Sequence, residues 1–468
     1  MHSVSPLESR HRDAPPPRFS RTTATLVLIC LVALALRLGF LWMEQRHVSH
    51  DRLSTVPFEY ETGNIAFALA SGKGFSSPLK IDTGPTAWLT PIYPAIVALS
   101  FKLFGAYTFA AFEACALLNI LLSTLTCVPV YFAGRDIAGP RIGTLAASLW
   151  AIFPAAIVIP FEWIWDTSLS ALIAAVILWA TLRIADSARR RDWCLYGLLW
   201  GFALMTNPSL GSLLPFFLGW MAWRARKKSA ASTGTVWLRN AILSAAVVVL
   251  ACLPWTIRNY EDFHAFVPMR SALGLQLWLG NNPYYIHEWG AWLHPIDNPN
   301  ERAKYIEDGE IAYMSEKLHL GLHYIWIFPR HAAELARQKF VATWLGTAHP
   351  LRDFSRARVA LELAVDASNI LISLGVIAGI VVLLARRHPY AFPLIVVPIV
   401  YPCLYYVTVA LLRYRHPIDP ILILISAVAL SGVLPKRWLA PTFVASGASV
   451  APVATEAAYA TTPTGVAI

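Results

Sequence analysis

The stretch TTATLVLICLVALALRLGFLWM, Thr22–Met43, is apolar along almost its whole length, with Arg37 as its one charged residue. It is long enough to cross a bilayer as a helix, which takes about 20 apolar residues. The polar residues 1–21 before it carry four arginines. No small-residue cleavage site follows it, so we interpret it as a retained first membrane helix that leaves the N-terminal tail in the cytoplasm.

The rest of the chain has the same character. Of its 468 residues 56% are hydrophobic and 14% are charged, which indicates a polytopic membrane protein. The net charge of +10 is better explained by cytoplasmic loops and anionic lipid headgroups than by nucleic acid, so we expect the bilayer and not a nucleic acid as its partner. The six cysteines lie in or beside apolar runs without CxxC spacing and are interpreted as small core residues.

Apolar runs, oriented by clusters of Lys and Arg, predict about ten membrane helices. The short run at 90–106 is assigned to an interfacial helix on the outer surface, because counting it as a span would put the basic loops outside. The run Trp193–Trp223 begins and ends at basic clusters but is too short for two full spans. It therefore predicts two short helices that break at TNPS (206–209) inside the membrane, where protein or a cavity must surround the break.

The predicted fold class is all-α, a polytopic membrane protein with outer-face interfacial helices in the first loop and a mixed extracytoplasmic segment later. The expected parts are a cytoplasmic tail (1–21), a transmembrane core (22–257) with an outer loop (44–108), an extracytoplasmic segment (258–365), C-terminal membrane helices (366–435) and a disordered cytoplasmic tail (436–468).

Four acidic residues fall at the outer membrane face. Glu59 and Glu61 follow the first span, and Glu162 and Asp166 lie at the top of a later helical hairpin. Glu162 and Asp166 are four residues apart, so a helix would place both on one side. Charges at the membrane are costly and therefore suggest function, although a solvated loop position explains Glu162 equally well.

The same face carries a basic group. Arginine presents a planar fork of donors that suits phosphate oxygens. Carboxylates beside such a group favour transfer from a lipid-linked phosphate donor to a hydroxyl acceptor, with a carboxylate as base. Snorkelling to headgroups explains Arg37 and Arg258 equally well, and interfacial anchoring is the alternative for Arg413 and Arg415. The members are Arg37, Arg258, Arg413, Arg415 and His416.

The segment after residue 258 offers candidates for sugar recognition. Trp278, Asn281 and Asn282 have the aromatic and amide groups that suit sugar faces and hydroxyls, although interfacial anchoring explains tryptophans there as well. The histidines of this segment show no metal-ligand spacing, and most are expected at the surface: His264, His287, His294, His319 and His323.

Over about residues 22–434 the chain resembles the GT-C-fold glycosyltransferases that use polyprenyl-phosphate sugars, such as the protein O-mannosyltransferases and the lipid A aminoarabinose transferases. The order and placement of several segments carry the resemblance: EYETGNIAFALASGKGFSSP, GPTAWLTPIYPAIVALSFKLFG, EWIWDTSLSAL, TNPS, PWTIRNYEDF and LLRYRHPIDPILIL.

The resemblance implies a catalytic base at Glu61 or Glu59. It implies a second acidic residue, Asp166 or Glu162, that binds the acceptor or, with Glu61, a divalent cation such as Mg or Mn. Many members carry an Asp-Glu pair where this chain reads Phe58-Glu59, which leaves the base open between the two glutamates and weakens the case for a metal. We favour Glu61, because it directly precedes the expected helix start.

The resemblance also implies that Arg413 and Arg415 hold the lipid phosphate and that the transfer inverts the anomeric centre. The expected protein is a multi-pass glycosyltransferase of the inner (plasma) membrane with an extracytoplasmic active site. Its partners would be a polyprenyl-phosphate-linked sugar and a glycan, lipid or protein acceptor. Two alternatives stay open: a secondary transporter, which would also use the break at 206–209, and a lipid-linked polysaccharide ligase or polymerase.

Overall fold

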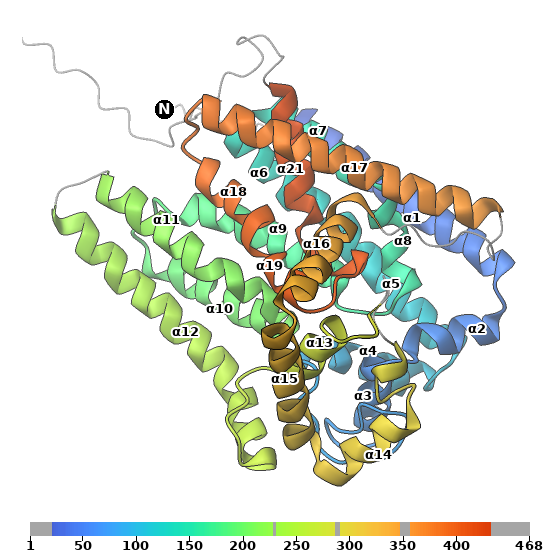
Figure 1. Ribbon diagram of the computed structural model, residues 1–468. Helices are drawn as coiled ribbons and strands as arrows, with labels where there is room; N and C mark the ends of the chain where they lie inside the picture. Colours follow the sequence, from blue (N-terminus) through green and yellow to red (C-terminus); the bar gives the residue numbers. More distant parts are fainter. Residues whose placement is uncertain (1–20, 228–230, 286–290, 347–355, 432–468) are drawn as a thin grey trace, which may run out of the picture.

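The computed structural model describes residues 21–227, 231–285, 291–346 and 356–431. Within these ranges the regular elements are α-helices and short 3-10 turns (Figure 1). The stretch Thr22–Met43 lies inside helix α1, Arg21–His47, as predicted. The expected tails, apart from Arg21, lie outside the described residues.

Five helices of the described chain are long and apolar enough to cross a membrane, or six if the bent pair α7 (Pro140–Ile152) and α8 (Pro154–Glu162) forms one span. The axes of this pair differ by 47°. The predicted number of ten is therefore not confirmed, because the remaining apolar helices are shorter. The five are α1, α5 with α6 (Phe109–Leu125 and Cys127–Ala138), α9 (Thr167–Ile184), α12 (Ala231–Phe263) and α17 (Arg356–Ala385).

The predicted break at 206–209 is present. Helix α10 (Arg190–Thr206) ends there, and the 3-10 turn η2 (Pro208–Leu213) leads into α11 (Leu214–Lys227). Pro208 has no amide hydrogen to continue the helix, and the Asn207 side chain instead accepts a hydrogen bond from the amide of Ser209 at 3.1 Å.

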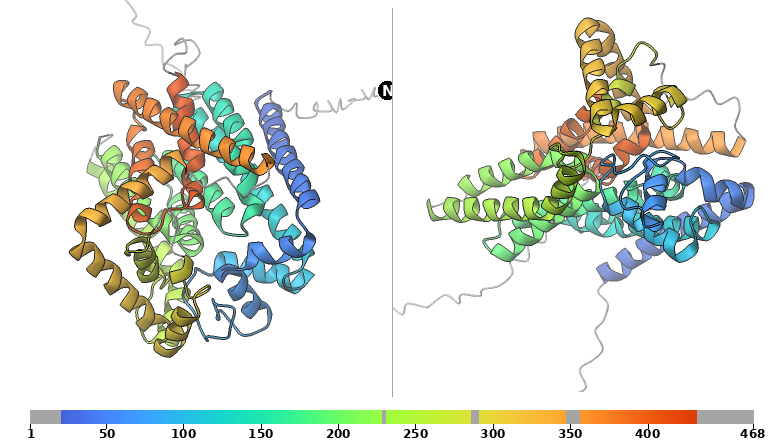
Figure 2. Two further views of the ribbon diagram at one scale, coloured as in Figure 1. Left: turned by 45° about the vertical axis from the view of Figure 1, so that its right-hand side comes forward. Right: turned by 90° about the horizontal axis from the view of Figure 1, so that it is seen from below.

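The outer helices come from two distant parts of the sequence. The first part gives α2 (His50–Thr55), α3 (Glu61–Ala70) and α4 (Ile92–Phe104), and the short helix α4 matches the predicted interfacial run. Helices α3, α4 and α14 gather at the lower end of Figure 1, and Figure 2 shows them from two other sides. The second part gives α13 (Leu273–Gly280), α14 (Pro299–Asp308), α15 (Glu310–Ile327) and α16 (Pro329–Leu345).

Near the C-terminal end of the described chain, α18 (Ala391–Val400), α19 (Cys403–Val407), α20 (Leu412–Arg415) and α21 (Asp419–Ser431) follow α17. Helices α17 and α21 pack closely, because a Cβ at Gly379 would lie 2.2 Å from the carbonyl oxygen of Ile425. This contact fixes α21, and with it the residues just before α21, against the membrane core.

Candidate active site

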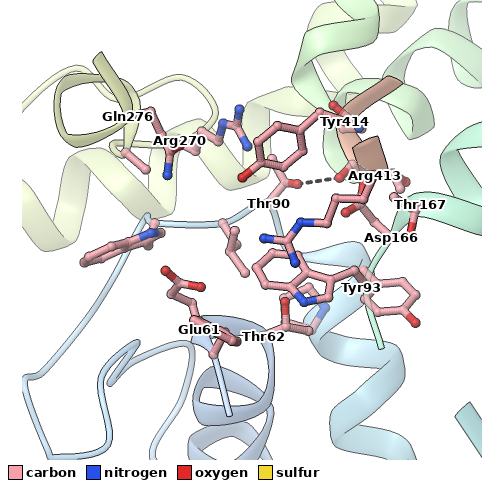
Figure 3. Close-up of a pocket in the computed structure, with 18 of the residues that line it drawn as sticks. Glu61, Thr62, Thr90, Tyr93, Asp166, Thr167, Arg270, Gln276, Arg413 and Tyr414 are labelled. Carbon is pink, nitrogen blue, oxygen red and sulfur yellow. Dashed lines mark hydrogen bonds between the residues drawn. The ribbon is translucent and has the colours of Figure 1, made fainter. Parts of the chain in front are cut away.

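A cavity of about 110 Å³ lies where the first outer loop, the α8–α9 connection and the residues around α20 meet (Figure 3). Three of the residues singled out in the sequence line it together: Glu61, Asp166 and Arg413. Arg270 and His294 join them from the later outer segment. Aromatic, hydroxyl and amide side chains lie among these charged groups, including Trp88, Thr90, Tyr93, Trp165, Gln276 and Tyr414.

Glu61 is the first residue of α3, and 7% of its side chain is exposed. Its Oε1 lies 3.0 Å from Nε2 of His294. The amide of Ile296 donates to Nδ1 of the same ring at 3.2 Å, so Nε2 is the nitrogen that carries a proton toward Glu61. Burial acts to raise the pKa of Glu61, but the hydrogen bond and charge of His294, with a smaller effect of Arg413, outweigh it and hold the pKa below its ordinary value.

Asp166 precedes the first residue of α9 and accepts a hydrogen bond from Oγ of Ser170 at 2.8 Å. Burial raises its pKa above the ordinary value, and Ser170 and the charges of Arg270 and Arg413 offset this only in part. The two carboxylates of one cavity therefore have pKa values displaced in opposite directions, a pattern typical of paired acids with different tasks.

The two arginines of the cavity keep their donors available. Among the described residues, neither Arg270 nor Arg413 makes a hydrogen bond or an ion pair. The Arg413 guanidinium lies 4.5 Å from the ring centroid of Trp165 and 5.1 Å from that of Trp163, so cation–π contacts hold it in place without using its N–H groups. Figure 3 shows its side chain reaching into the cavity above Glu61. Two such arginines suit an anion with several oxygens.

The break after α10 also belongs to the cavity, which Thr206 and Asn207 line. The carbonyl oxygen of Thr206, which the end of the helix frees, accepts a hydrogen bond from Oγ1 of Thr90 at 2.9 Å (dashed in Figure 3). The break is thus surrounded by protein and a cavity, as a polar backbone at membrane depth requires.

Arg415 and His416 are not in the cavity, although they follow Arg413 closely. Both are fully buried beside Asp419, at 2.8 Å and 3.1 Å from its carboxylate oxygens. Arg415 also donates to the carbonyl oxygen of Thr343 at 2.9 Å and to Asn369. Since both side chains are buried against Asp419 and neither lines the cavity, we remove both residues from the lipid-phosphate group and assign them to holding the α20–α21 connection.

Arg37 is also enclosed by protein. Its guanidinium donates to Oγ of Ser123 at 3.0 Å and to the carbonyl oxygens of Ala151 and Trp150 at 3.0 Å and 3.3 Å. These two carbonyls lie at the C-terminal end of α7, where that of Trp150 also accepts from the amide of Phe153 at 3.3 Å. The expectation that Arg37 binds lipid phosphate is therefore corrected to a structural role at this bend.

Arg258 likewise uses its donors within the protein. It donates to the carbonyl oxygens of Thr86 and Phe75, both at 2.6 Å, and lies 2.7 Å from the carboxylate of Asp262. It ties the end of α12 to the first outer loop, and it does not line the cavity. We remove it from the phosphate-binding group as well.

The other two acidic candidates also lie away from the cavity. The side chain of Glu59 is 46% exposed and lies 3.8 Å from Nζ of Lys80, where it lines a separate groove. Glu162 is the last residue of α8 and is exposed. The structure thus places Glu61 and Asp166 at the cavity, and not Glu59 and Glu162.

The proposed sugar-binding residues terminate a helix. Asn281 donates to the carbonyl oxygens of Leu277 and Val407, and Asn282 donates to that of Trp278 at 2.9 Å. These bonds satisfy the last carbonyls of α13. None of Trp278, Asn281 and Asn282 lines the cavity.

Sequence reasoning missed Arg270, Gln276 and His294. Arg270 lies in a polar loop shortly after α12. Its only signal in the sequence was this position, near the same end of α12 as Arg258. The expectation of a surface position is wrong for His294, which is 1% exposed. His264, His319 and His323 are exposed, and His287 lies outside the described residues.

The described residues offer no group of three or more His, Cys, Asp or Glu side chains placed to hold a metal ion. Glu61, Asp166 and His294 line the same cavity, but they are not placed as such a group. Within the described residues the structure therefore shows no protein-held metal site, and the expectation of a divalent cation stays a prediction that EDTA treatment can test.

Comparison with known proteins agrees with this architecture. Residues 88–255 match the family model described as dolichyl-phosphate-mannose-protein mannosyltransferase. Among curated proteins, no sequence matches the chain.

Solved structures give the fold. The oligosaccharyltransferase of Archaeoglobus fulgidus, in a complex with Zn and sulfate, is 15% identical, with a TM-score of 0.51 over 88% of this chain and 49% of the archaeal one. The same enzyme in complex with an inhibitory peptide and a dolichol-phosphate is 14% identical, with a TM-score of 0.50 over 89% of this chain and 50% of the archaeal one. The chain thus spans about half the length of this enzyme. ArnT from Cupriavidus metallidurans, bound to undecaprenyl phosphate, is 14% identical over 88% of this chain and 77% of ArnT, with a TM-score of 0.38.

The family-model match over residues 88–255 and the shared architecture agree with the resemblance found in the sequence: the chain is a membrane protein with the GT-C fold.

Proposed function

We propose that this protein transfers a sugar from a polyprenyl-phosphate donor to an acceptor hydroxyl. One observation carries the proposal: two carboxylates, Glu61 and Asp166, line the same cavity as Arg270 and Arg413, two arginines that make no hydrogen bond or ion pair within the described chain. The first pair suits a hydroxyl that must lose a proton, and the second suits a phosphate that leaves as an anion. An archaeal enzyme of this fold, solved with a dolichol-phosphate, supports a lipid-phosphate donor.

In the proposed reaction the acceptor hydroxyl attacks the anomeric carbon of the sugar, and the bond between that carbon and the phosphate oxygen breaks. The hydroxyl proton passes to Glu61, and the electron pair of the broken bond leaves with the lipid phosphate. Arg270 and Arg413 stabilise the charge that develops on the phosphate. A single displacement of this kind inverts the anomeric centre. Asp166 orients the acceptor or, with its raised pKa, acts as the alternative base.

The distribution of basic residues supports an extracytoplasmic site. The cavity lies at the start of α9 and the end of α10. The opposite ends of α9, α10 and α11 carry the basic residues that usually face the cytoplasm. These are Arg183, Arg190, Arg191, Arg224, Arg226 and Lys227.

The test is sugar release from a panel of radiolabelled polyprenyl-phosphate sugars by the purified protein, with and without EDTA. We expect one donor class to turn over, and Glu61→Gln and Arg413→Ala each to reduce kcat/KM by about a hundredfold or more. Matched controls are Glu59→Gln, an acid outside the cavity, and Arg46→Ala, an arginine that also lies over a tryptophan (Trp42, 3.7 Å). Both controls should keep activity.

No turnover of any donor by folded protein that binds the lipid would contradict the proposal. If the protein were a polysaccharide polymerase or ligase, only donors that carry a whole glycan would react. If the protein were a transporter, the Glu61→Gln variant would still carry its substrate across the membrane.

A further inference from the structure

Glu310 is a buried carboxylate that lies behind the cavity wall and has no part in the chemistry proposed above. It is the first residue of α15 and is 6% exposed. Its oxygens accept four hydrogen bonds: from the amide of Ala87 at 2.8 Å, and from the hydroxyls of Thr86, Ser271 and Tyr305 at 2.5, 2.7 and 2.7 Å. A buried carboxylate with four donors is a strong and specific junction.

The donors come from three separate parts of the chain, and two of these parts continue directly into the cavity wall. Thr86 and Ala87 belong to the first outer loop and precede Trp88, which lines the cavity. Ser271 follows Arg270, which lines it from the other side. The amide of Ser271 also donates to the carbonyl oxygen of Ala87 at 2.8 Å, so the two segments lie against each other at Glu310.

We infer that Glu310 is a positioning residue: it joins the first outer loop to the segment of Arg270 and thereby sets where the Arg270 guanidinium meets the anion. The inference rests on the proposed function for its catalytic consequence, but the junction itself is independent of it. Arg270 has no hydrogen bond or ion pair among the described residues, so its position depends on its backbone. Glu310 fixes that backbone through the neighbouring Ser271.

The experiment combines Glu310 and Arg270 in a double-mutant cycle. Arg270→Ala should lower kcat/KM for the lipid-phosphate donor by about a hundredfold. Glu310→Ala should lower it by about tenfold to a hundredfold, since small displacements of a binding group are costly. If Glu310 acts through Arg270, the double variant should stay within about threefold of Arg270→Ala alone. Independent effects that multiply would overturn the inference.

Two further variants separate positioning from general loss of structure. In Glu310→Gln the remaining oxygen can still accept from Ala87 and Ser271, while the hydroxyls of Thr86 and Tyr305 can turn to accept from the amide. It should therefore restore most of the activity.

Glu301→Ala is the matched control. Glu301 is an acid of the same region that accepts from the Tyr313 hydroxyl at 2.7 Å and lies 2.6 Å from Nζ of Lys317, but no donor to it adjoins the cavity. Its effect should multiply with that of Arg270→Ala.

Hydrogen exchange gives a readout that needs no activity. In Glu310→Ala, but not in Glu301→Ala, amide exchange should rise in residues 86–88 and 270–272 together. Unchanged exchange there would overturn the inference even if the enzyme is active. Raised exchange in a protein that transfers no sugar would instead keep the junction and reject the proposed reaction.

Discussion

At the scale of single residues, the cavity sets two carboxylates in different surroundings. Glu61 faces His294 at 3.0 Å, while Asp166 accepts from Ser170 and has no such ring beside it. Burial acts to raise the pKa of both; it prevails at Asp166, whose pKa is raised, but His294 outweighs it at Glu61, whose pKa is lowered. The pH dependence of the reaction therefore tells which of the two acts as base.

His294→Phe removes the ring nitrogens from Glu61 and keeps a ring in the site. Burial of Glu61 remains while the lowering effect of His294 is lost, so the pKa of Glu61 should rise. A base works as the carboxylate, and activity is lost as the pH falls through its pKa. The acid limb of the kcat/KM profile should therefore move to higher pH in the variant, measured on the donor identified above.

The exposed His319→Phe is the control and should leave the profile unchanged. An acid limb that does not move in His294→Phe would favour Asp166 as the base.

Residue types at the outer face could be predicted from sequence, but their roles only in part. Glu61, Asp166 and Arg413 could be found because charges at the ends of apolar runs are rare and share one membrane face. Arg37 and Arg415 have the same signal in the sequence, yet Arg37 donates to backbone carbonyls and Arg415 pairs with Asp419. A local sequence cannot distinguish a cation that faces lipid phosphate from one that faces a helix end. His294 was missed because its partner, Glu61, is more than 200 residues away in the sequence.

At the scale of elements, the bend between α7 and α8 depends on a side chain from α1. Arg37 donates to the carbonyl oxygens of Ala151 and Trp150 at the C-terminal end of α7. Arg37→Leu should therefore cost about 2 to 4 kcal/mol of stability, because buried acceptors lose their donor. The measurement is Tm in detergent together with the KM for the lipid donor. Tm should fall while KM stays the same, whereas Arg413→Ala should show the reverse.

The contact between α17 and α21 gives a second prediction for an element. Gly379→Leu would place a side chain where even a Cβ lies 2.2 Å from the carbonyl oxygen of Ile425, so the helices must separate. We expect a loss of about 1 to 3 kcal/mol, seen as a lower Tm. Gly219→Leu in α11 is the matched control, since no atom lies within 4 Å of a Cβ there. Equal Tm values for the two variants would contradict the packing described.

At the scale of the whole molecule, composition was enough to predict an all-α membrane protein, and the broken helix pair at 206–209 was found from its length and basic ends. The number of membrane spans could not be predicted in this way. Apolar runs were counted as ten helices, but five to six helices of the described chain have the length to cross a membrane. The other predicted spans fall on α10, α11, α18 with α19, and α21, which are shorter in the described chain than a helix needs to cross a membrane by itself. Packing inside the bundle, which a linear pattern does not contain, sets these lengths.

The orientation of the molecule can be tested by cysteine labelling in a background without the native cysteines. Glu59 and Arg190 are both exposed and lie at opposite ends of the structure's helices. An impermeant maleimide added to intact cells should label Glu59→Cys, as the proposed extracytoplasmic site requires. Arg190→Cys should react only after the membrane is opened. Labelling with the opposite preference would place the cavity on the cytoplasmic side.

The cavity is assembled from residues 61, 166, 270, 294 and 413, and this order has a consequence during synthesis. A growing chain presents both carboxylates to the membrane long before Arg413 leaves the ribosome. Under the proposed function, the lipid phosphate would until then meet only one of its two arginines, and an unfinished chain would not hold an activated sugar beside its base. The cavity is complete only when the late helices have closed against the early ones.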